Sequence, residues 1–338
     1  MKTAGKIFYV LLGIVLAVST IGTAPRGLSQ VNKEIYKKAE AYQPQIDELG
    51  FSGFQLKDYK VRFYDGKNDY VTSNGKYKKE KPVFNTFVGT TYKVDKEYQV
   101  ILPTLEQFSN LFDLLGAAEG ISEGNISFKK SDYSKDEHVA TLWHEATHAY
   151  QMTHYEKQIT TLMDNFLTNS GLLASNNSSD DSSESASADF MEKTVSSVDS
   201  NKTVVKLYKK QITLLKKAYH ATDIAEKQSL VSQYLDLQKE RADCMTGSQL
   251  ALENYYECVE GTARYVEAHI YTAEKGQKAS DMQYVDDFSY NNGSGKYYTA
   301  GMIKCCLLDS FLPQWKEDFQ YTVSLDELLA KGINGNGL

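Results

Sequence analysis

The apolar residues of this chain follow two different periods along its length. Between residues 59 and 103 they alternate with a period of two, which predicts three strands, at 60–64, 83–91 and 98–102. Elsewhere they recur at helical spacing, which predicts helices at 31–49, 104–115, 136–163, 202–219, 224–242, 249–273 and 297–311. This pattern predicts an α+β fold, with a small antiparallel or mixed sheet in the N-terminal half and a mainly helical C-terminal half.

The change of period divides the chain into two expected subdomains. Residues 29–135 would form a sheet-containing N-terminal subdomain, and residues 136–338 a helical one. Within the second lies a stretch rich in serine and acidic residues, with almost no apolar side chain between residues 170 and 187. Because such a segment buries too little apolar surface to order itself, we expect a disordered insertion at about 168–201.

Residues 1–28 have the composition of a targeting segment. Lys2 and Lys6 precede an apolar run at 7–22, and small residues follow it. This order is typical of a secretory signal peptide, although residues 7–24 just reach the length of an uncleaved membrane anchor. Either alternative places the rest of the chain outside the cytoplasm, secreted or held at the cell surface through this apolar segment.

The amino-acid composition limits the classes of protein to which the chain can belong. Hydrophobic residues make up 41% of the 338 positions, which is enough for a packed core. Because 44 acidic residues outweigh 37 basic ones, the formal net charge is −7. This balance argues against a nucleic-acid partner, which requires a basic footprint, and it leaves the oligomeric state open.

Four cysteines lie in the last hundred residues, and in an exported chain they suggest disulfides. If one straight helix carries both Cys244 and Cys258, about 21 Å separates them, too far for a bond. We therefore expect one or both to pair with Cys305 or Cys306, with four reduced thiols as the alternative.

The segment His144-Glu145-Ala146-Thr147-His148 carries the most specific chemical signal. On a helix, His144 and His148 project from one face, one turn apart, so that two imidazoles can share a tetrahedral metal ion. Glu145 lies about 100° around the helix axis, where its carboxylate can take a proton from a water molecule. The spacing predicts a metal site that needs a third protein ligand.

A downstream helix offers that ligand at Glu260. There the sequence runs Glu260-Gly261-Thr262-Ala263-Arg264-Tyr265, and together with the two histidines it resembles the gluzincin metallopeptidases, in particular their aminopeptidase branch. The resemblance implies a zincin-like fold, a Zn²⁺ ion held by His144, His148 and Glu260, and Glu145 as general base. Because Gly261 has no Cβ, we expect it to let this helix approach the metal helix closely.

The same resemblance extends to Tyr298-Thr299-Ala300-Gly301. In the family, the tyrosine of this motif stabilises the oxyanion of the tetrahedral intermediate, a role that would fall to Tyr298, with Tyr297 as an adjacent alternative. Two features depart from the family. More than a hundred residues separate His148 from Glu260, and the N-terminal half contains no recognisable motif for binding a substrate amine, so aminopeptidase specificity does not carry over.

Other interpretations of these residues stay open at the level of sequence. His154 stands at the third-ligand spacing of the metzincin peptidases, but Gln151 occupies the position where they need a glycine to turn the chain. Around Glu260, charged residues recur every three or four positions, which could be a solvated helix face. Glu257 and Glu267 are alternative third ligands, and either of them or Arg264 could instead orient a ligand.

The sequence thus predicts an exported zinc-dependent peptidase that hydrolyses peptide bonds with a metal-activated water and Glu145 as base. The strand at 98–102 could provide an edge along which an extended peptide substrate lies. The rival hypothesis is a non-catalytic extracellular protein that uses the same fold for binding or as a structural module. Neither the substrate nor the mode of cleavage, terminal or internal, can be deduced.

Overall fold

The computed structural model describes residues 27–335 apart from 74, 84, 87, 115–120, 124–125, 129–133, 172–181 and 278–289. The predicted targeting segment, except for its last two residues, lies outside this set. Among the described residues, no helix combines the length and the hydropathy that a membrane span requires. The α+β class is confirmed, with one mixed sheet and a majority of helix.

The described chain divides into two compact units. The sheet unit comprises residues 27–154 and 266–277, and the helical unit comprises residues 155–265 and 290–335. This boundary differs from the one expected at residue 135, because two long helices contribute to both units. They are α4 (Lys135–Asn169) and α9 (Gly247–Glu274).

The sheet unit contains a five-stranded sheet in the order β3-β2-β1-β5-β4. Its strands are β1 (Val61–Tyr64), β2 (Asp69–Ser73), β3 (Lys76–Glu80), β4 (Thr90–Val94) and β5 (Glu97–Pro103). Only the β1–β5 pair is parallel, with Val61 opposite Val100, so the sheet is mixed. A separate antiparallel pair is formed by β6 (Ile121–Glu123) and β7 (Ile126–Phe128).

One predicted strand and one predicted sheet edge are wrong. Residues 83–91 were expected to form a strand, but β4 begins only at Thr90, and Val83 instead donates its N–H to Asp69 at 3.1 Å. The strand at 98–102 is present within β5, but it lies between β1 and β4 and therefore offers no free edge. The edge beside it is β4.

Helices of the sheet unit pack through apolar faces. They are α1 (Gln30–Ala41), α2 (Gln43–Glu48), a 3₁₀ turn (Leu56–Asp58) and α3 (Leu105–Leu114). The first half of α4 is held by Trp143, which is fully buried and donates its indole N–H to the Ala39 carbonyl oxygen at 3.1 Å. Its ring also meets Phe54 edge to face at 5.5 Å. These contacts fix the helix that carries the histidine motif.

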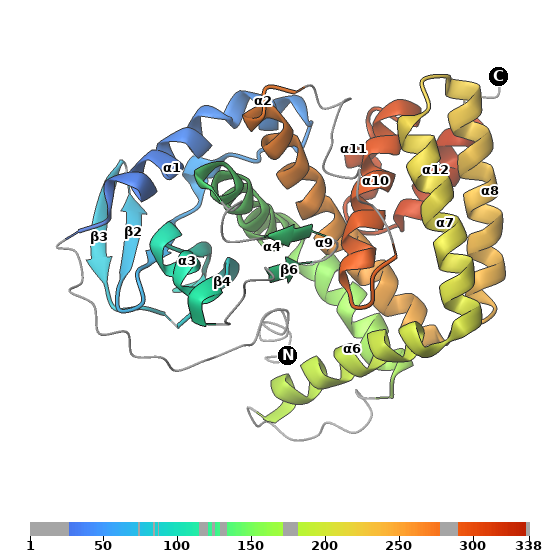
Figure 1. The fold of residues 1–338 in the computed structure, drawn as a ribbon, viewed down its shortest axis with the longest axis horizontal. Helices are drawn as coiled ribbons and strands as arrows, with labels where there is room; N and C mark the ends of the chain where they lie inside the picture. The colour runs from blue at the N-terminus through green and yellow to red at the C-terminus, as the bar shows by residue number, and fades with distance from the viewer. Residues whose placement is uncertain are drawn as a thin grey trace. The chain divides into compact units, whose positions relative to one another are not determined.

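The helical unit contains six further helices, shown with the rest of the chain in Figure 1. They are α6 (Ser182–Ser200), α7 (Lys202–His220), α8 (Ile224–Ala242), α10 (Gly295–Phe311), α11 (Trp315–Phe319) and α12 (Leu325–Gly335). Asn201 and Asp223 cap α7 and α8 by accepting backbone N–H groups of the first turn. The two capped helices pack along each other, and α10 packs against α7 and α12.

The expected disordered insertion is wrong over much of its length. From Ser182 to Ser200 the chain forms α6, and Met191, Val195 and Val198 on this helix are buried. These three residues recur at helical spacing, so the segment buries more apolar surface than its serine content indicates. Residues 172–181 lie outside the described set.

The expected disulfides are not formed. All four cysteines are free, with Cys258 and Cys305 buried and Cys244 exposed. Burial raises the pKa of the Cys258 thiol above its ordinary value. A buried thiol of this kind behaves as a small apolar side chain.

Candidate metal centre

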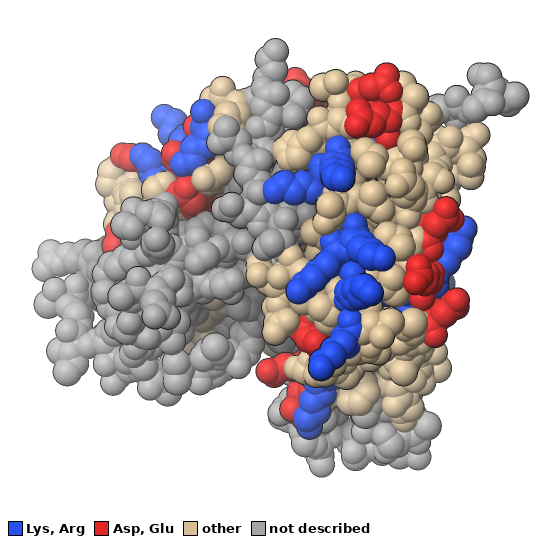
Figure 2. All heavy atoms as spheres, turned by 45° about the vertical axis from the view of Figure 1, so that its right-hand side comes forward, with Lys and Arg blue, Asp and Glu red and all other residues tan. Residues whose placement is uncertain are grey.

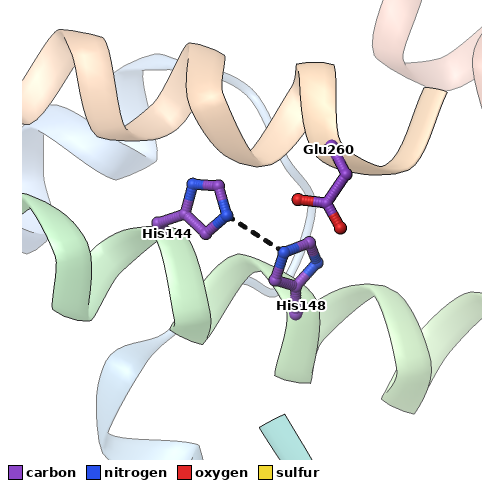
Figure 3. Close-up of side chains that lie close together, drawn as sticks. All are labelled: His144, His148 and Glu260. Atoms are coloured by element: carbon purple, nitrogen blue, oxygen red, sulfur yellow. Dashed lines mark hydrogen bonds between the residues drawn. The ribbon is translucent and has the colours of Figure 1, made fainter. Parts of the chain in front are cut away.

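Helix α4 carries the predicted motif as the sequence required. His144, Glu145 and His148 lie within its continuous helical part, and each side chain is buried, with about one-twentieth of its surface exposed. The two imidazole rings project from the same side of α4, with ring centres 4.8 Å apart (Figure 3). Burying two histidines side by side requires polar partners for all four ring nitrogens.

Each imidazole has a partner at Nδ1. His144 Nδ1 lies 2.8 Å from a carboxylate oxygen of Glu267, and His148 Nδ1 lies 2.8 Å from the amide oxygen of Gln151. Because both partners are acceptors, both Nδ1 atoms carry the proton and both Nε2 atoms present a lone pair. The partners therefore set the tautomer that a metal ligand needs.

The two Nε2 atoms lie 3.1 Å apart. Two lone pairs at this distance repel each other unless a cation lies between or beside them. At metal–nitrogen distances of about 2.0–2.1 Å, a tetrahedral ion places two imidazole nitrogens about 3.3 Å apart. The observed spacing therefore fits a shared metal ion better than a direct hydrogen bond between two neutral rings.

Glu260 on α9 completes the group. One ligand atom from each of His144, His148 and Glu260 lies within 4.8 Å of the others, and all three residues are buried. In Figure 3 the Glu260 carboxylate projects from α9 toward the imidazoles. Two nitrogens and one carboxylate oxygen form a donor set that Zn²⁺ accepts, and three protein ligands leave a fourth position open. The residues present therefore fit a divalent metal ion.

The charged residues around Glu260 do not form a solvated face. The charged residues of this stripe are all buried: Glu253, Glu257, Glu260, Arg264 and Glu267. Most of them have a partner of their own. Arg241 binds Glu253 through both terminal guanidinium nitrogens, and the ammonium group of Lys304 lies 2.7 Å from a carboxylate oxygen of Glu257. Burial raises the pKa of Glu257 to about 8 against the opposing charge of Lys304. Glu257 is thus committed to Lys304, and Glu267 to His144.

Gly261 makes a different contact from the one expected. A Cβ atom on Gly261 would lie 2.6 Å from the Cα atom of Gly301, on α10, so the glycine allows α9 to cross α10 closely. The expectation that it brings α9 close to the metal helix stays a prediction. The glycines of the two sequence motifs therefore meet at one crossing, and Gly301 fixes α10 next to the turn of α9 that carries Glu260.

Tyr298 lies beside the same turn. Its ring centre is 5.8 Å from that of Tyr256 and 5.9 Å from the guanidinium carbon of Arg264. Tyr256, Glu260 and Arg264 are one helical turn apart and share a face of α9, so Tyr298 lies over the face that carries Glu260. The alternative, Tyr297, is stacked on Tyr256 with nearly parallel rings 5.9 Å apart.

Glu145 is enclosed by the edge strand β4 and the residue before it. Its backbone carbonyl accepts a hydrogen bond from the Thr91 hydroxyl at 2.7 Å. A Cβ atom at Gly89 would lie 2.8 Å from a carboxylate oxygen of Glu145, so any larger residue there would force the Glu145 side chain to shift. Sequence reasoning missed Gly89, Thr91 and the role of Gln151, because only the fold brings β4 to this turn of α4.

Two other histidines, His154 and His138, do not belong to the group. His154 is exposed, and its ring lies 4.7 Å from that of Tyr150. Gln151 is helical, and the helix departs from regular geometry only at Tyr155, so the turn that the metzincin spacing needs is absent at Gln151. His138 is fully buried and donates its Nε2–H to the Pro103 carbonyl oxygen at 2.9 Å.

Comparison with known proteins identifies no relative. No family model matches the chain, and neither the curated proteins nor the solved structures contain a match. The fold and the site alone define an α+β protein with a buried group of two histidines and one glutamate that could hold a metal ion.

Proposed function

We propose that this protein is an exported zinc-dependent peptidase of gluzincin type with a zincin-like fold. The observation that carries the proposal is the buried group of His144, His148 and Glu260, with both histidines held in the tautomer that a metal requires. The donor set alone does not select zinc. The choice of zinc comes from the resemblance of the His144–His148 segment, Glu260-Gly261 and Tyr298-xx-Gly301 to that family.

The residues of the site would have separate roles in the reaction. When bound, a Zn²⁺ ion supplies a Lewis acid that polarises a peptide carbonyl and lowers the pKa of a water molecule. The Glu145 carboxylate, held against Gly89, accepts the proton of the attacking water and passes it to the departing amine. The Tyr298 hydroxyl donates to the oxygen that becomes negative during the attack.

Strand β4 is the expected place for the substrate backbone. It is the last strand of the five-stranded sheet, next to β5, and Thr91 on it contacts Glu145. An extended peptide that paired with this edge would pass Glu145 with its backbone groups satisfied. This assignment replaces the strand at 98–102, which lies inside the sheet.

Metal content and hydrolysis test the proposal together. The purified full chain should bind about one zinc ion, and a pool of fluorogenic peptides should reveal hydrolysis. Glu145→Gln should retain the metal and lose about 10²- to 10⁴-fold in rate, the usual contribution of a general base. Glu317→Gln, an exposed change on α11, should leave both unchanged.

Two results would contradict the proposal. A chain that holds no metal in excess zinc lacks the predicted centre. A chain that binds zinc but shows no hydrolysis dependent on Glu145 is instead the non-catalytic binding or structural protein. Glu260→Gln separates the third ligand from its neighbours, because it should weaken zinc binding without breaking the Lys304–Glu257 or His144–Glu267 pairs.

A further inference from the structure

Helix α7 in the helical unit presents an unusual charge distribution. It contains six lysines and no acidic residue: Lys202, Lys206, Lys209, Lys210, Lys216 and Lys217. At 100° per residue, all six fall within a sector of about 120° around the helix axis. Between the first and the last of them, the helix advances about 22 Å. We call these six residues the lysine strip.

The lysine strip is exposed, and four of its six lysines form no ion pair with the residues that the structure describes. Five of its side chains are exposed and Lys216 is partly so. Among the residues that the structure describes, Lys202, Lys206, Lys210 and Lys217 form no ion pair, whereas other surface lysines do, such as Lys193 with Asp189. The chain as a whole carries −7, so this strip is a local excess of positive charge on an acidic protein.

Acidic residues border the lysine strip along one side. Figure 2 shows the basic side chains in a column over α7, with acidic ones beside them over α8. Helix α8 packs along α7, and its exposed charged residues are mostly acidic: Glu226, Asp236 and Glu240, with Lys239 paired to Asp236. The positive region is therefore long and narrow.

We propose that the lysine strip binds a linear polyanion that carries regularly spaced phosphate groups. A flat anionic bilayer large enough to cover α7 would also face α8, where exposed acids outnumber exposed lysines, and repulsion there would weaken its binding. A single extended chain can follow the strip and avoid them. Lysine ammonium groups act as point charges and suit phosphates without fixing one geometry, so the strip would recognise charge rather than sequence. This inference is independent of the proposed peptidase activity.

Salt-dependent binding to a labelled polyphosphate chain tests this proposal. For a flexible polyanion, the logarithm of the binding constant falls with the logarithm of salt concentration by about 0.7 per neutralised charge, which gives a slope near −4 for six lysines. Replacement of Lys202, Lys206, Lys210 and Lys217 by Gln should reduce the slope to about −1.4. The binding constant in 0.1 M salt should then fall by up to about 600-fold.

A matched variant controls for net charge. Replacing Lys33, Lys37, Lys57 and Lys76 by Gln removes four other exposed lysines without a described ion pair, so the slope should stay near −4. Equal salt-dependence slopes for polyphosphate and oligothymidylate would support recognition of backbone charge. A steeper slope for one of the two polyanions would show that this polyanion makes more contacts with the lysine strip. Three results would overturn the proposal: no binding at low salt, equal losses in both variants, or binding only to vesicles containing phosphatidylglycerol.

Discussion

The crossing of α9 and α10 can be tested by adding one methyl group at Gly301. A Cβ atom there would lie 2.8 Å from the Cα atom of Gly261 and still closer to the Glu257 carbonyl oxygen, whereas ordinary contacts begin at 3.4 Å. Both obstacles are backbone atoms and cannot rotate away, so the helices must separate by about 0.6 Å or more. Overpacking of this kind costs about 3 kcal/mol, and the higher helix propensity of alanine returns about 1 kcal/mol.

We therefore expect Gly301→Ala to destabilise the protein by about 2 kcal/mol, or roughly 4–8 °C in melting temperature. Urea unfolding followed by circular dichroism measures the change. Gly335→Ala provides the control, because it is also helical and nothing lies within 4 Å of an added Cβ there. A Gly301→Ala variant as stable as Gly335→Ala would show that the two backbones do not meet, and the placement of Tyr298 beside the Glu260 turn would lose its support.

Two further predictions concern the histidines of α4. Glu267→Ala should weaken zinc binding about 10- to 100-fold in a chelator competition, because it removes the acceptor that holds His144 Nδ1, and an unchanged affinity would refute that role. Burial lowers the pKa of His138 from 6.5 to about 4. Between these two values the unfolded chain binds the proton more readily than the folded one. The folded state therefore loses stability as the pH falls through this interval. The loss between pH 7 and pH 4.5 should be about 2.5 kcal/mol in urea titrations. His138→Gln keeps an N–H donor for Pro103 and should remove this loss, and a variant with the same pH dependence as the native chain would show that another group causes it.

Long periodic segments allowed most helices to be predicted from the sequence. Helix α8 was expected at 224–242 and has these bounds, because the spacing of its apolar residues and the capping residue Asp223 indicate the same helix. The sheet was less predictable. Strand β3, Lys76–Glu80, contains three lysines, and only its pairing with β2 identifies it as a strand. Helix α6 was missed because serines obscured the helical spacing of its apolar residues.

The candidate site, like the fold, could be predicted from the sequence only in part. The local spacing of His144, Glu145 and His148 fixed their arrangement on α4, since one helix turn determines it. The partner of Gly261 depends on which helix crosses α9, which no local pattern contains. For the same reason, sequence reasoning could not foresee that Gly89 would enclose the Glu145 carboxylate.

Three carboxylates on α9 have different surroundings, and their spacing along the helix accounts for this difference. Glu260 and Glu267 are seven residues apart, two turns of one helix, so they project in nearly the same direction about 10 Å apart along the axis. Glu267 lies 2.8 Å from Nδ1 of His144, while Glu260 belongs to the group in which one ligand atom of each residue lies within 4.8 Å of the others. Glu257 lies on the turn before Glu260, where a fully buried lysine holds it. A stripe that the sequence alone could not distinguish from a solvated face thus separates into a carboxylate that could hold a metal ion, a carboxylate that contacts His144 and an internal ion pair, because each carboxylate meets a different side chain.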